Sequence, residues 1–122
     1  MDFVGRAVLV TGGARGIGRA IAAAFAQEGA AVAVGYREHG SEAQAVVAAL
    51  RRAGRRAIAV QGDVGRAGDA QAMVGQVRDE WERLDVLVNN AGILRRTPLA
   101  DLTLQEWDEV ISTNLTGVML CA

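Results

Sequence analysis

The sequence predicts an α/β fold, in which a doubly wound parallel β-sheet carries helices on both faces. Four short apolar runs alternate with longer segments of helical spacing, in the order β-α-β-α-β-α-β-α. The apolar runs are nearly continuous, as expected of strands that are buried on both faces. The residues are 51% hydrophobic but only 4% aromatic, which suits close packing of helices on a sheet. Right-handed crossovers then favour the strand order 3-2-1-4.

The four predicted strands cover residues 7–10, 31–35, 57–60 and 86–88. The first ends in Thr-Gly-Gly and the fourth in Asn-Asn-Ala-Gly, so polar and glycine residues follow two of the apolar runs. A loop that contains the only proline, Pro98, comes after the fourth strand. Since no repeat or linker interrupts this order, the chain forms one domain at most.

The predicted helices are recognised by apolar residues three and four positions apart. The first covers residues 16–28, the second runs from an N-cap at Ser41 to about residue 54, and the third covers about residues 70–84. Thr103 and Glu106 resemble a capping box that opens a last helix to the C-terminus. The apolar faces are expected to be Ile17, Ile21, Ala24 and Phe25 in the first helix, Ala43, Val46, Val47 and Leu50 in the second, and Ala70, Met73, Val74, Val77, Trp81 and Leu84 in the third.

A glycine-rich turn, TGGARGIG at residues 11–18, joins the first strand to the first helix. Gly12 permits a sharp turn, Gly16 permits close approach of a phosphate, and Gly18 permits close packing of the helix on the strand. The helix N-terminus then presents unpaired N–H groups to an anion. The turn therefore predicts a site for the pyrophosphate of a nicotinamide dinucleotide, the alternative being an ordinary strand-to-helix loop.

The residues after the second predicted strand indicate which dinucleotide is bound. An acidic residue there favours the free ribose of NAD, and a basic one favours the 2′-phosphate of NADP. Tyr36 stands at the acidic position and Arg37 follows it, while Arg15 is able to approach the same phosphate from the glycine turn. This favours NADP(H), with NAD(H) as the alternative, since Glu38 could pair with Arg37 or take a ribose hydroxyl. Asp63 is either an adenine ligand or a plain turn aspartate.

Charge and composition exclude several classes of protein. The 13 basic residues, all arginine, and 14 acidic residues give a net charge of −1 without a basic stripe, so no nucleic-acid partner is expected. No apolar run has the length of a membrane span, so no membrane association is expected. The single cysteine, Cys121, fits the cytoplasm, and no residue cluster has the spacing of a metal site.

The last predicted helix carries a polar residue on an apolar face. Trp107, Ile111, Asn114 and Val118 fall at i, i+4, i+7 and i+11. An amide on a buried face must be hydrogen-bonded. Asn114 is therefore either a functional residue or a buried asparagine that is satisfied by nearby backbone.

Together these motifs resemble the short-chain dehydrogenase/reductase family. The resemblance rests on TGGARGIG at 11–18, Asp63-Val64, NNAG at 89–92 and Asn114, which follow the order and spacing of the family. The run LVNNAGI is most similar to that of the 3-oxoacyl-(acyl carrier protein) reductase group. The resemblance implies a Rossmann-like fold, hydride transfer between NADP(H) and a small-molecule or acyl-carrier carbonyl substrate, and a homotetrameric parent protein.

The resemblance also implies a role for individual residues. Asn114 matches the asparagine of the family's Asn-Ser-Tyr-Lys catalytic tetrad. The implied cofactor-binding residues are Gly12, Arg15, Gly16, Ile17, Gly18, Tyr36, Arg37, Asp63, Val64, Asn90, Ala91 and Gly92.

The rest of the tetrad has no match. The chain has no lysine, and its one tyrosine, Tyr36, is followed by Arg-Glu-His-Gly. Both serines, Ser41 and Ser112, precede the region where the family's catalytic serine belongs. We therefore expect residues 1–122 to be an incomplete Rossmann-type NADP-binding domain without the C-terminal catalytic half, and inactive by itself. The alternative is a non-catalytic nucleotide-binding or interaction module.

Overall fold

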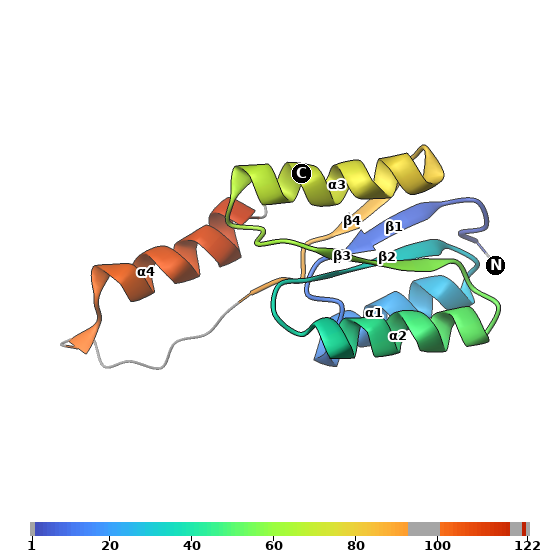
Figure 1. Ribbon diagram of the computed structural model, residues 1–122, viewed down its shortest axis with the longest axis horizontal. Helices are drawn as coiled ribbons and strands as arrows, with labels where there is room; N and C mark the ends of the chain where they lie inside the picture. Colours follow the sequence, from blue (N-terminus) through green and yellow to red (C-terminus); the bar gives the residue numbers. More distant parts are fainter. Residues whose placement is uncertain (1, 93–100, 118–120, 122) are drawn as a thin grey trace.

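The computed structural model describes residues 2–92, 101–117 and 121, so the predictions for Pro98 and Val118 lie outside the described residues. Its sheet contains β1 (Ala7–Val10), β2 (Ala31–Tyr36), β3 (Ala57–Gln61) and β4 (Val86–Val88). The strand order is β3-β2-β1-β4, and every pairing is parallel (Figure 1). The predicted fold class and strand order are confirmed.

Two strands run one residue beyond their predicted ends. β2 includes Tyr36 and β3 includes Gln61, and these two residues face each other in the ladder. A polar residue after an apolar run still pairs through its backbone, so side-chain hydropathy places the end too early. The extra residue carries β2 to the edge of the site described below.

Helices cover both faces of the sheet. The helices α1 (Gly16–Gln27) and α2 (Gly40–Arg52) lie on one face, and α3 (Ala67–Trp81) lies on the other (Figure 1). Successive side chains of a strand alternate between the faces. Val8 and Val10 accordingly pack in the cluster with α1 and α2, whereas Ala7 and Leu9 pack in the cluster with α3. Burial on both sides explains why the strands are continuous apolar runs.

The predicted apolar faces are correct for two helices and partly wrong for the first. In α2 all four predicted residues are buried. The residues predicted for the third helix are buried or packed against the buried cluster, although Leu84 lies beyond the end of α3. In α1 Ile17 is 74% exposed and Ala24 is exposed. Ile21 and Phe25 do pack against the buried cluster, but the fully buried residues of α1 are Gly18, Ala22 and Ala26. Residues without bulk allow this helix to approach the sheet closely, which a search for large apolar residues overlooks.

Of the two predicted N-cap residues, one is confirmed and the other is wrong. The Thr103 hydroxyl accepts a hydrogen bond from the Glu106 backbone N–H at 3.1 Å, so the predicted N-cap is confirmed. Ser41 is not an N-cap, because α2 begins at Gly40 and His39 precedes it. The carbonyl of His39 accepts the first bond of the helix, from the Ala43 N–H. Ser41 therefore lies inside the first turn.

The last helix is interrupted rather than continuous. Helix α4 (Leu104–Ile111) is followed directly by a π-helical segment, η2 (Ser112–Thr116). α4 projects beyond the carboxyl ends of the strands (Figure 1). Trp107 is 54% exposed and Asn114 is exposed, so the predicted burial of this face is wrong for the described part of the chain. The prediction fails because helical spacing identifies an apolar face but not what covers it.

The acidic side chain of Asp85 lies at the amino ends of β1 and β4, opposite the carboxyl ends of the strands. Asp85 Oδ2 accepts the Ala7 backbone N–H at 2.8 Å, and both carboxylate oxygens accept hydrogen bonds from Arg83 at 2.6 Å. These contacts hold the pKa of the Asp85 carboxyl below its usual value, the Arg83 hydrogen bond being the largest cause.

Among the described residues, no helix combines the length and hydropathy needed to cross a membrane.

Candidate functional site

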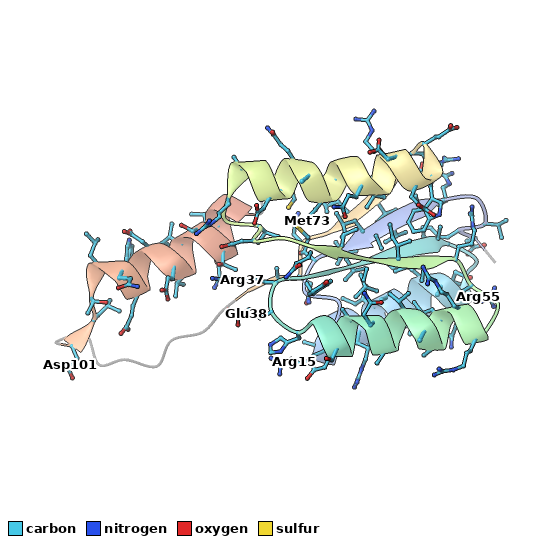
Figure 2. The ribbon with its side chains drawn as sticks, in the orientation of Figure 1. Arg15, Arg37, Glu38, Arg55, Met73 and Asp101 are labelled. Atoms are coloured by element: carbon cyan, nitrogen blue, oxygen red, sulfur yellow. The ribbon has the colours of Figure 1, made fainter. Side chains whose placement is uncertain are left out.

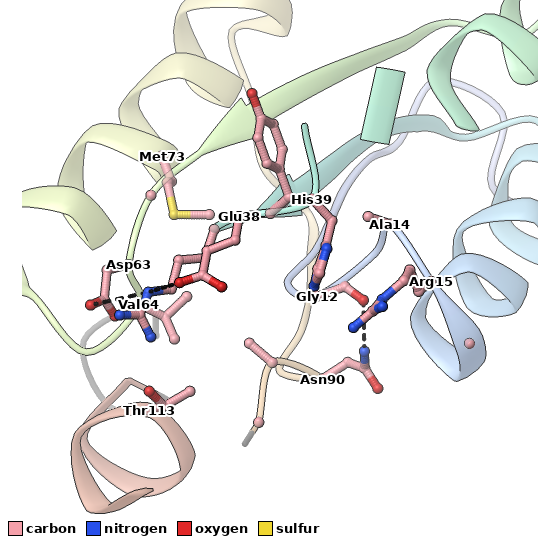
Figure 3. A pocket seen from close by; sticks show the side chains of 17 residues that line it. Gly12, Ala14, Arg15, Glu38, His39, Asp63, Val64, Met73, Asn90 and Thr113 are labelled. Carbon is pink, nitrogen blue, oxygen red and sulfur yellow. Dashed lines mark hydrogen bonds and ion pairs between the residues drawn. The ribbon is translucent and has the colours of Figure 1, made fainter. Parts of the chain in front are cut away.

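A pocket of about 470 Å³ opens at the carboxyl ends of all four strands (Figure 3). In a doubly wound sheet this edge is where ligands bind, because the strand order reverses there. The pocket collects most of the predicted site residues from turns that are distant in sequence. Those that line it are Gly12, Arg15, Gly16, Tyr36, Arg37, Asp63, Val64, Asn90, Ala91 and Gly92.

The glycine turn forms one wall of this pocket. Gly12 and Gly16 have φ angles of +64° and +56°, in the left-handed region that favours glycine. Helix α1 starts at Gly16 and has neither a side-chain cap nor an acidic residue in its first turn. Its first N–H groups therefore remain available to an anion, together with the positive end of the helix dipole.

Gly18 supports this wall from below rather than lining it. A Cβ at Gly18 would collide with the carbonyl oxygen of Gly12, and it would lie 2.5 Å from Nδ2 of Asn90. Gly18 is buried, whereas Ile17 points outward and is 74% exposed. Neither of these two residues is among those that line the pocket.

The turn after β4 is hydrogen-bonded directly to the glycine turn. The Thr11 hydroxyl oxygen accepts the backbone N–H groups of Asn90 and Ala91, each at 3.0 Å, and the hydroxyl donates to the Val88 carbonyl at 3.3 Å. The Asn90 side-chain amide donates to the Gly12 carbonyl at 3.1 Å (Figure 3). Thr11 is only 2% exposed, so these bonds are shielded from water. They hold the two adjacent turns together at the edge of the pocket.

Two arginines approach the pocket from different turns. Figure 2 places Arg15 and Arg37 between the sheet and α4, with Arg55 at the far end of the sheet. Nε of Arg15 lies 3.3 Å from Oε2 of Glu42. Nε of Arg37 lies 3.7 Å from Oδ2 of Asp63 and 4.0 Å from the Glu38 carboxylate. Each of these arginines therefore has a carboxylate partner.

Asp63 is held in a defined position at the end of β3. Its Oδ1 accepts the Gly65 backbone N–H at 2.9 Å, and its own N–H donates to Asp69 at 2.9 Å. Oδ2 faces Nε of both Arg37 and Arg66, at 3.7 Å and 3.8 Å. The adjacent Val64 is buried and supplies an apolar surface. Asp63 thus makes the bonds of a turn aspartate while it lines the pocket.

Asn114 lies beside the pocket instead of lining it. A Cβ at Gly92 would lie 3.3 Å from Oδ1 of Asn114, so the amide is placed against the turn after β4. Its neighbour Thr113 is buried and does line the pocket. Segment η2 packs on the turn after β3, where a Cβ at Gly65 would lie 2.9 Å from the Ser112 carbonyl oxygen, and Gly117, just after η2, leaves room for the Val64 side chain.

Glu38, which the sequence offered as a partner of Arg37 or of a ribose hydroxyl, also lines the pocket and lies 4.0 Å from Arg37. Several lining residues were not identified from the sequence: Ala14, Gly35, His39, Gly62, Met73 and Thr113. Gly35 and Gly62 lie at the carboxyl ends of β2 and β3, and His39 follows Arg37 by two residues, so strand position was an available signal. Met73 reaches the pocket from α3, where it was predicted only as a core residue. Thr113 comes from the segment that follows α4, and no local motif predicts that this segment reaches the pocket. Within the described residues, no group of three or more histidine, cysteine or acidic residues has the arrangement of a metal site.

Comparison with known proteins defines the class. The family model of the short chain dehydrogenases matches residues 6–122, so the chain belongs to this family. The resemblance expected from the glycine turn and the NNAG run is thereby confirmed.

Individual relatives extend this comparison. The chain is 48% identical over 113 residues to a 3-oxoacyl-[acyl-carrier-protein] reductase of Synechocystis sp., covering 93% of this chain and 46% of that protein. It is 47% identical over 116 residues to the 3-oxoacyl-[acyl-carrier-protein] reductase FabG of Staphylococcus aureus strain Mu50, covering 95% and 47%. The chain thus spans about half the length of the curated relatives it matches.

Solved structures also match nearly the whole of this chain and about half of their own. A short chain dehydrogenase from Burkholderia cenocepacia J2315 in complex with NADP has a TM-score of 0.96 and 44% identity, covering 99% of this chain and 49% of that one. A blue fluorescent protein from a metagenomic library in complex with NADPH has a TM-score of 0.94 and 35% identity, covering 99% and 50%.

Proposed function

We propose that this pocket binds NADP(H) and that the chain is the cofactor-binding part of an oxidoreductase that reduces a carbonyl or oxidises an alcohol. The observation that carries the proposal is the approach of Arg15 and Arg37 to one pocket from two different turns. Two guanidiniums form planar, charge-assisted hydrogen bonds to a phosphate, whereas the ribose of NAD carries only a hydroxyl. The NADP and NADPH complexes of two similar structures support this choice of cofactor.

The same pocket offers a place for each part of the dinucleotide. The glycine turn, with Ile17 at its rim and Gly18 beneath it, and the free N–H groups of α1 fit a pyrophosphate. Asp63 and Val64 combine a hydrogen-bond acceptor with an apolar surface, as an adenine ring requires. Asn90 orients the glycine turn, and Ala91 and Gly92 border the space next to it, where the second ribose would lie.

The proposed substrate is a carbonyl compound, either a small molecule or an acyl group on a carrier protein. Both relatives described above are named as reductases of 3-oxoacyl groups on acyl-carrier protein, which supports the second class. A bound nicotinamide would supply the hydride, and Asn114 is the residue of this chain proposed to assist catalysis. Tyr36, the only tyrosine, lies at the end of β2 among the residues proposed for the adenosine end. No proton-donating role is therefore assigned to it.

Titration with adenosine fragments tests the proposed cofactor directly. 2′,5′-ADP contains the adenosine end of NADP with its 2′-phosphate, and 5′-AMP lacks that phosphate. Charge-assisted hydrogen bonds are strong enough that we expect calorimetry to give about tenfold tighter binding of 2′,5′-ADP, or more. Arg37→Ala should reduce this preference severalfold. Equal affinity of the wild-type chain for both fragments would refute NADP selection.

A matched control is available in the same cluster. Arg66→Ala also removes a guanidinium that pairs with Asp63, but Arg66 is not among the residues that line the pocket. We expect this variant to retain the preference for 2′,5′-ADP. A loss as large as that of Arg37→Ala would indicate a general effect of positive charge instead of a phosphate site.

A non-catalytic nucleotide-binding module is the second candidate, favoured by the absence of lysine from the sequence. Binding of NADPH is expected in both cases, so the codons after residue 122 separate them. A serine and a Tyr-x-x-x-Lys in frame support the oxidoreductase, and a stop codon supports the module. We further propose a homotetrameric parent protein, by family resemblance, and a cytoplasmic location, supported by the use of a single cysteine.

A further inference from the structure

The carboxylate beside Arg15 belongs to a different element from the arginine itself. Arg15 precedes α1, whereas Glu42 lies in the first turn of α2. Their ion pair, at 3.3 Å, therefore crosses from the glycine turn to the helix that follows β2. Arg37 and His39, which follow β2, line the same pocket as Arg15.

We propose that Glu42 competes with the 2′-phosphate of the cofactor for Arg15, and so lowers the preference of the site for NADP(H) over NAD(H). This inference rests on the proposed function of the pocket. A phosphate carries between one and two negative charges at neutral pH. To bind it, Arg15 must exchange the Glu42 carboxylate for the phosphate, and the remaining carboxylate repels the new anion. The neutral 2′-hydroxyl of NAD meets no such repulsion.

The solvent exposure of the Arg15–Glu42 ion pair indicates that Glu42 competes for Arg15 and does not hold it in place for a phosphate. The side chains of Arg15 and Glu42 are 60% and 47% exposed. An ion pair so open to solvent is a weak restraint, because water screens it and two long side chains resist ordering. Glu42 therefore does little to hold the guanidinium in one orientation, but its charge stays close to the position where the phosphate would bind.

The second arginine of the pocket is arranged differently. Arg37 shares its partner Asp63 with Arg66, so Asp63 keeps a cation when Arg37 turns toward a phosphate. Among the ion pairs of the described residues, Glu42 has Arg15 as its one partner. Exchange at Arg15 consequently leaves Glu42 without a counter-charge, whereas exchange at Arg37 leaves only Glu38, whose contact with the arginine is longer, 4.0 Å against 3.3 Å. The competition is thus expected to be stronger at Glu42.

The test is Glu42→Gln, which removes the charge and nearly keeps the shape. We expect the chain to bind 2′,5′-ADP about two- to fivefold more tightly by calorimetry, since exposed pairs are worth little more than this factor. The affinity for 5′-AMP should stay unchanged. Glu80→Gln, which removes the same charge from an exposed position of α3, should change neither affinity. An unchanged or lower preference for 2′,5′-ADP in Glu42→Gln would overturn the proposal.

Two further measurements separate this mechanism from its alternatives. In the Arg15→Ala background the effect of Glu42→Gln should shrink toward onefold, and an undiminished effect would show that Glu42 does not act through Arg15. Circular dichroism checks helix content, because a carboxylate in the first turn of α2 also favours the helix dipole. If the wild-type chain itself shows no preference for 2′,5′-ADP, the proposed function fails, whereas a wild-type preference without a Glu42→Gln effect refutes only the competition.

Discussion

The Thr11 hydroxyl oxygen accepts the backbone N–H of Asn90 across the first and fourth strands, at 3.0 Å. These residues follow β1 and β4, which are adjacent in the sheet although about eighty positions separate the two residues in the sequence. The bond joins two motifs, the glycine turn and the NNAG run, that are recognisable separately. The fold brings these two motifs into contact, which neither motif indicates by itself.

Thr11→Val removes the hydroxyl and keeps the branched shape. The N–H groups of Asn90 and Ala91 then lose their acceptor in a buried position, so we expect a loss of about 1–3 kcal/mol of unfolding free energy. Urea denaturation followed by circular dichroism measures it. Thr11→Ser retains the hydroxyl and should lose clearly less. Equal losses in the two variants would show that packing, and not hydrogen bonding, is responsible.

Asn90→Asp reverses the polarity of the contact with the glycine turn. The native amide donates to the Gly12 carbonyl at 3.1 Å, and a carboxylate would repel that oxygen and any phosphate nearby. We expect weaker binding of NADPH than in Asn90→Ala, which only removes the donor. Calorimetric titration of both variants makes the comparison. The reverse order of affinities would contradict a repulsive effect.

Gly18→Ala tests how closely α1 approaches the glycine turn. A Cβ there meets the Gly12 carbonyl oxygen, so the helix must shift, and overpacking of this kind costs about 1–3 kcal/mol. Gly75→Ala is the matched control, because a Cβ at Gly75 on α3 has no atom within 4 Å. Helix propensity predicts that this control gains about 0.5–1 kcal/mol. Opposite signs in urea denaturation are expected, and a gain in both variants would exclude close packing at Gly18.

Acid should weaken the contact that Asp85 makes with the start of β1. Because folding lowers the pKa of this carboxyl, its contribution to stability is present above the unfolded pKa of about 3.9. The contribution is lost as the pH falls through the lower, folded pKa. The difference in unfolding free energy between wild type and Asp85→Asn should therefore be largest above about pH 5 and shrink below about pH 4. Urea titrations at several pH values measure it.

The control for this pH dependence is Asp79→Asn, which changes the same charge at an exposed position of α3. Its difference from wild type should vary less over the acid range. If the Asp85→Asn difference grew as the pH fell, folding would have to raise the pKa of that carboxyl, contrary to its bonds with Arg83 and the Ala7 N–H.

Local signals in the sequence were sufficient for the sheet and for the glycine turn. The apolar runs located the strands because burial on both faces requires them, and the crossover rule then supplied the order β3-β2-β1-β4. Glycine spacing indicated Gly12 and Gly16, whose left-handed backbone angles allow few other residues. Each of these signals reflects a constraint that acts within one turn or one strand.

Contacts between distant segments were not predictable in the same way. The pairing of Arg15 with Glu42 depends on how α2 returns beside the glycine turn, and the burial of Thr113 depends on where α4 ends. Ile17 looked like a core residue by spacing, yet α1 packs through Gly18, Ala22 and Ala26. Periodicity gives the direction of a side chain around its helix, whereas burial depends on which neighbour reaches that side.

In the π-helical segment η2, the number of residues matters more for the structure than which residues they are. The Gly117 N–H bonds the Ser112 carbonyl five residues back, so this turn contains one residue more than an α-turn. Removing any one residue between 112 and 116 would allow an uninterrupted α-helix, and the residues that remain in the segment would take new directions around its axis. Thr113 and Asn114 would then no longer face the turns after β3 and β4. Substitutions in η2 are therefore better tolerated than single-residue deletions.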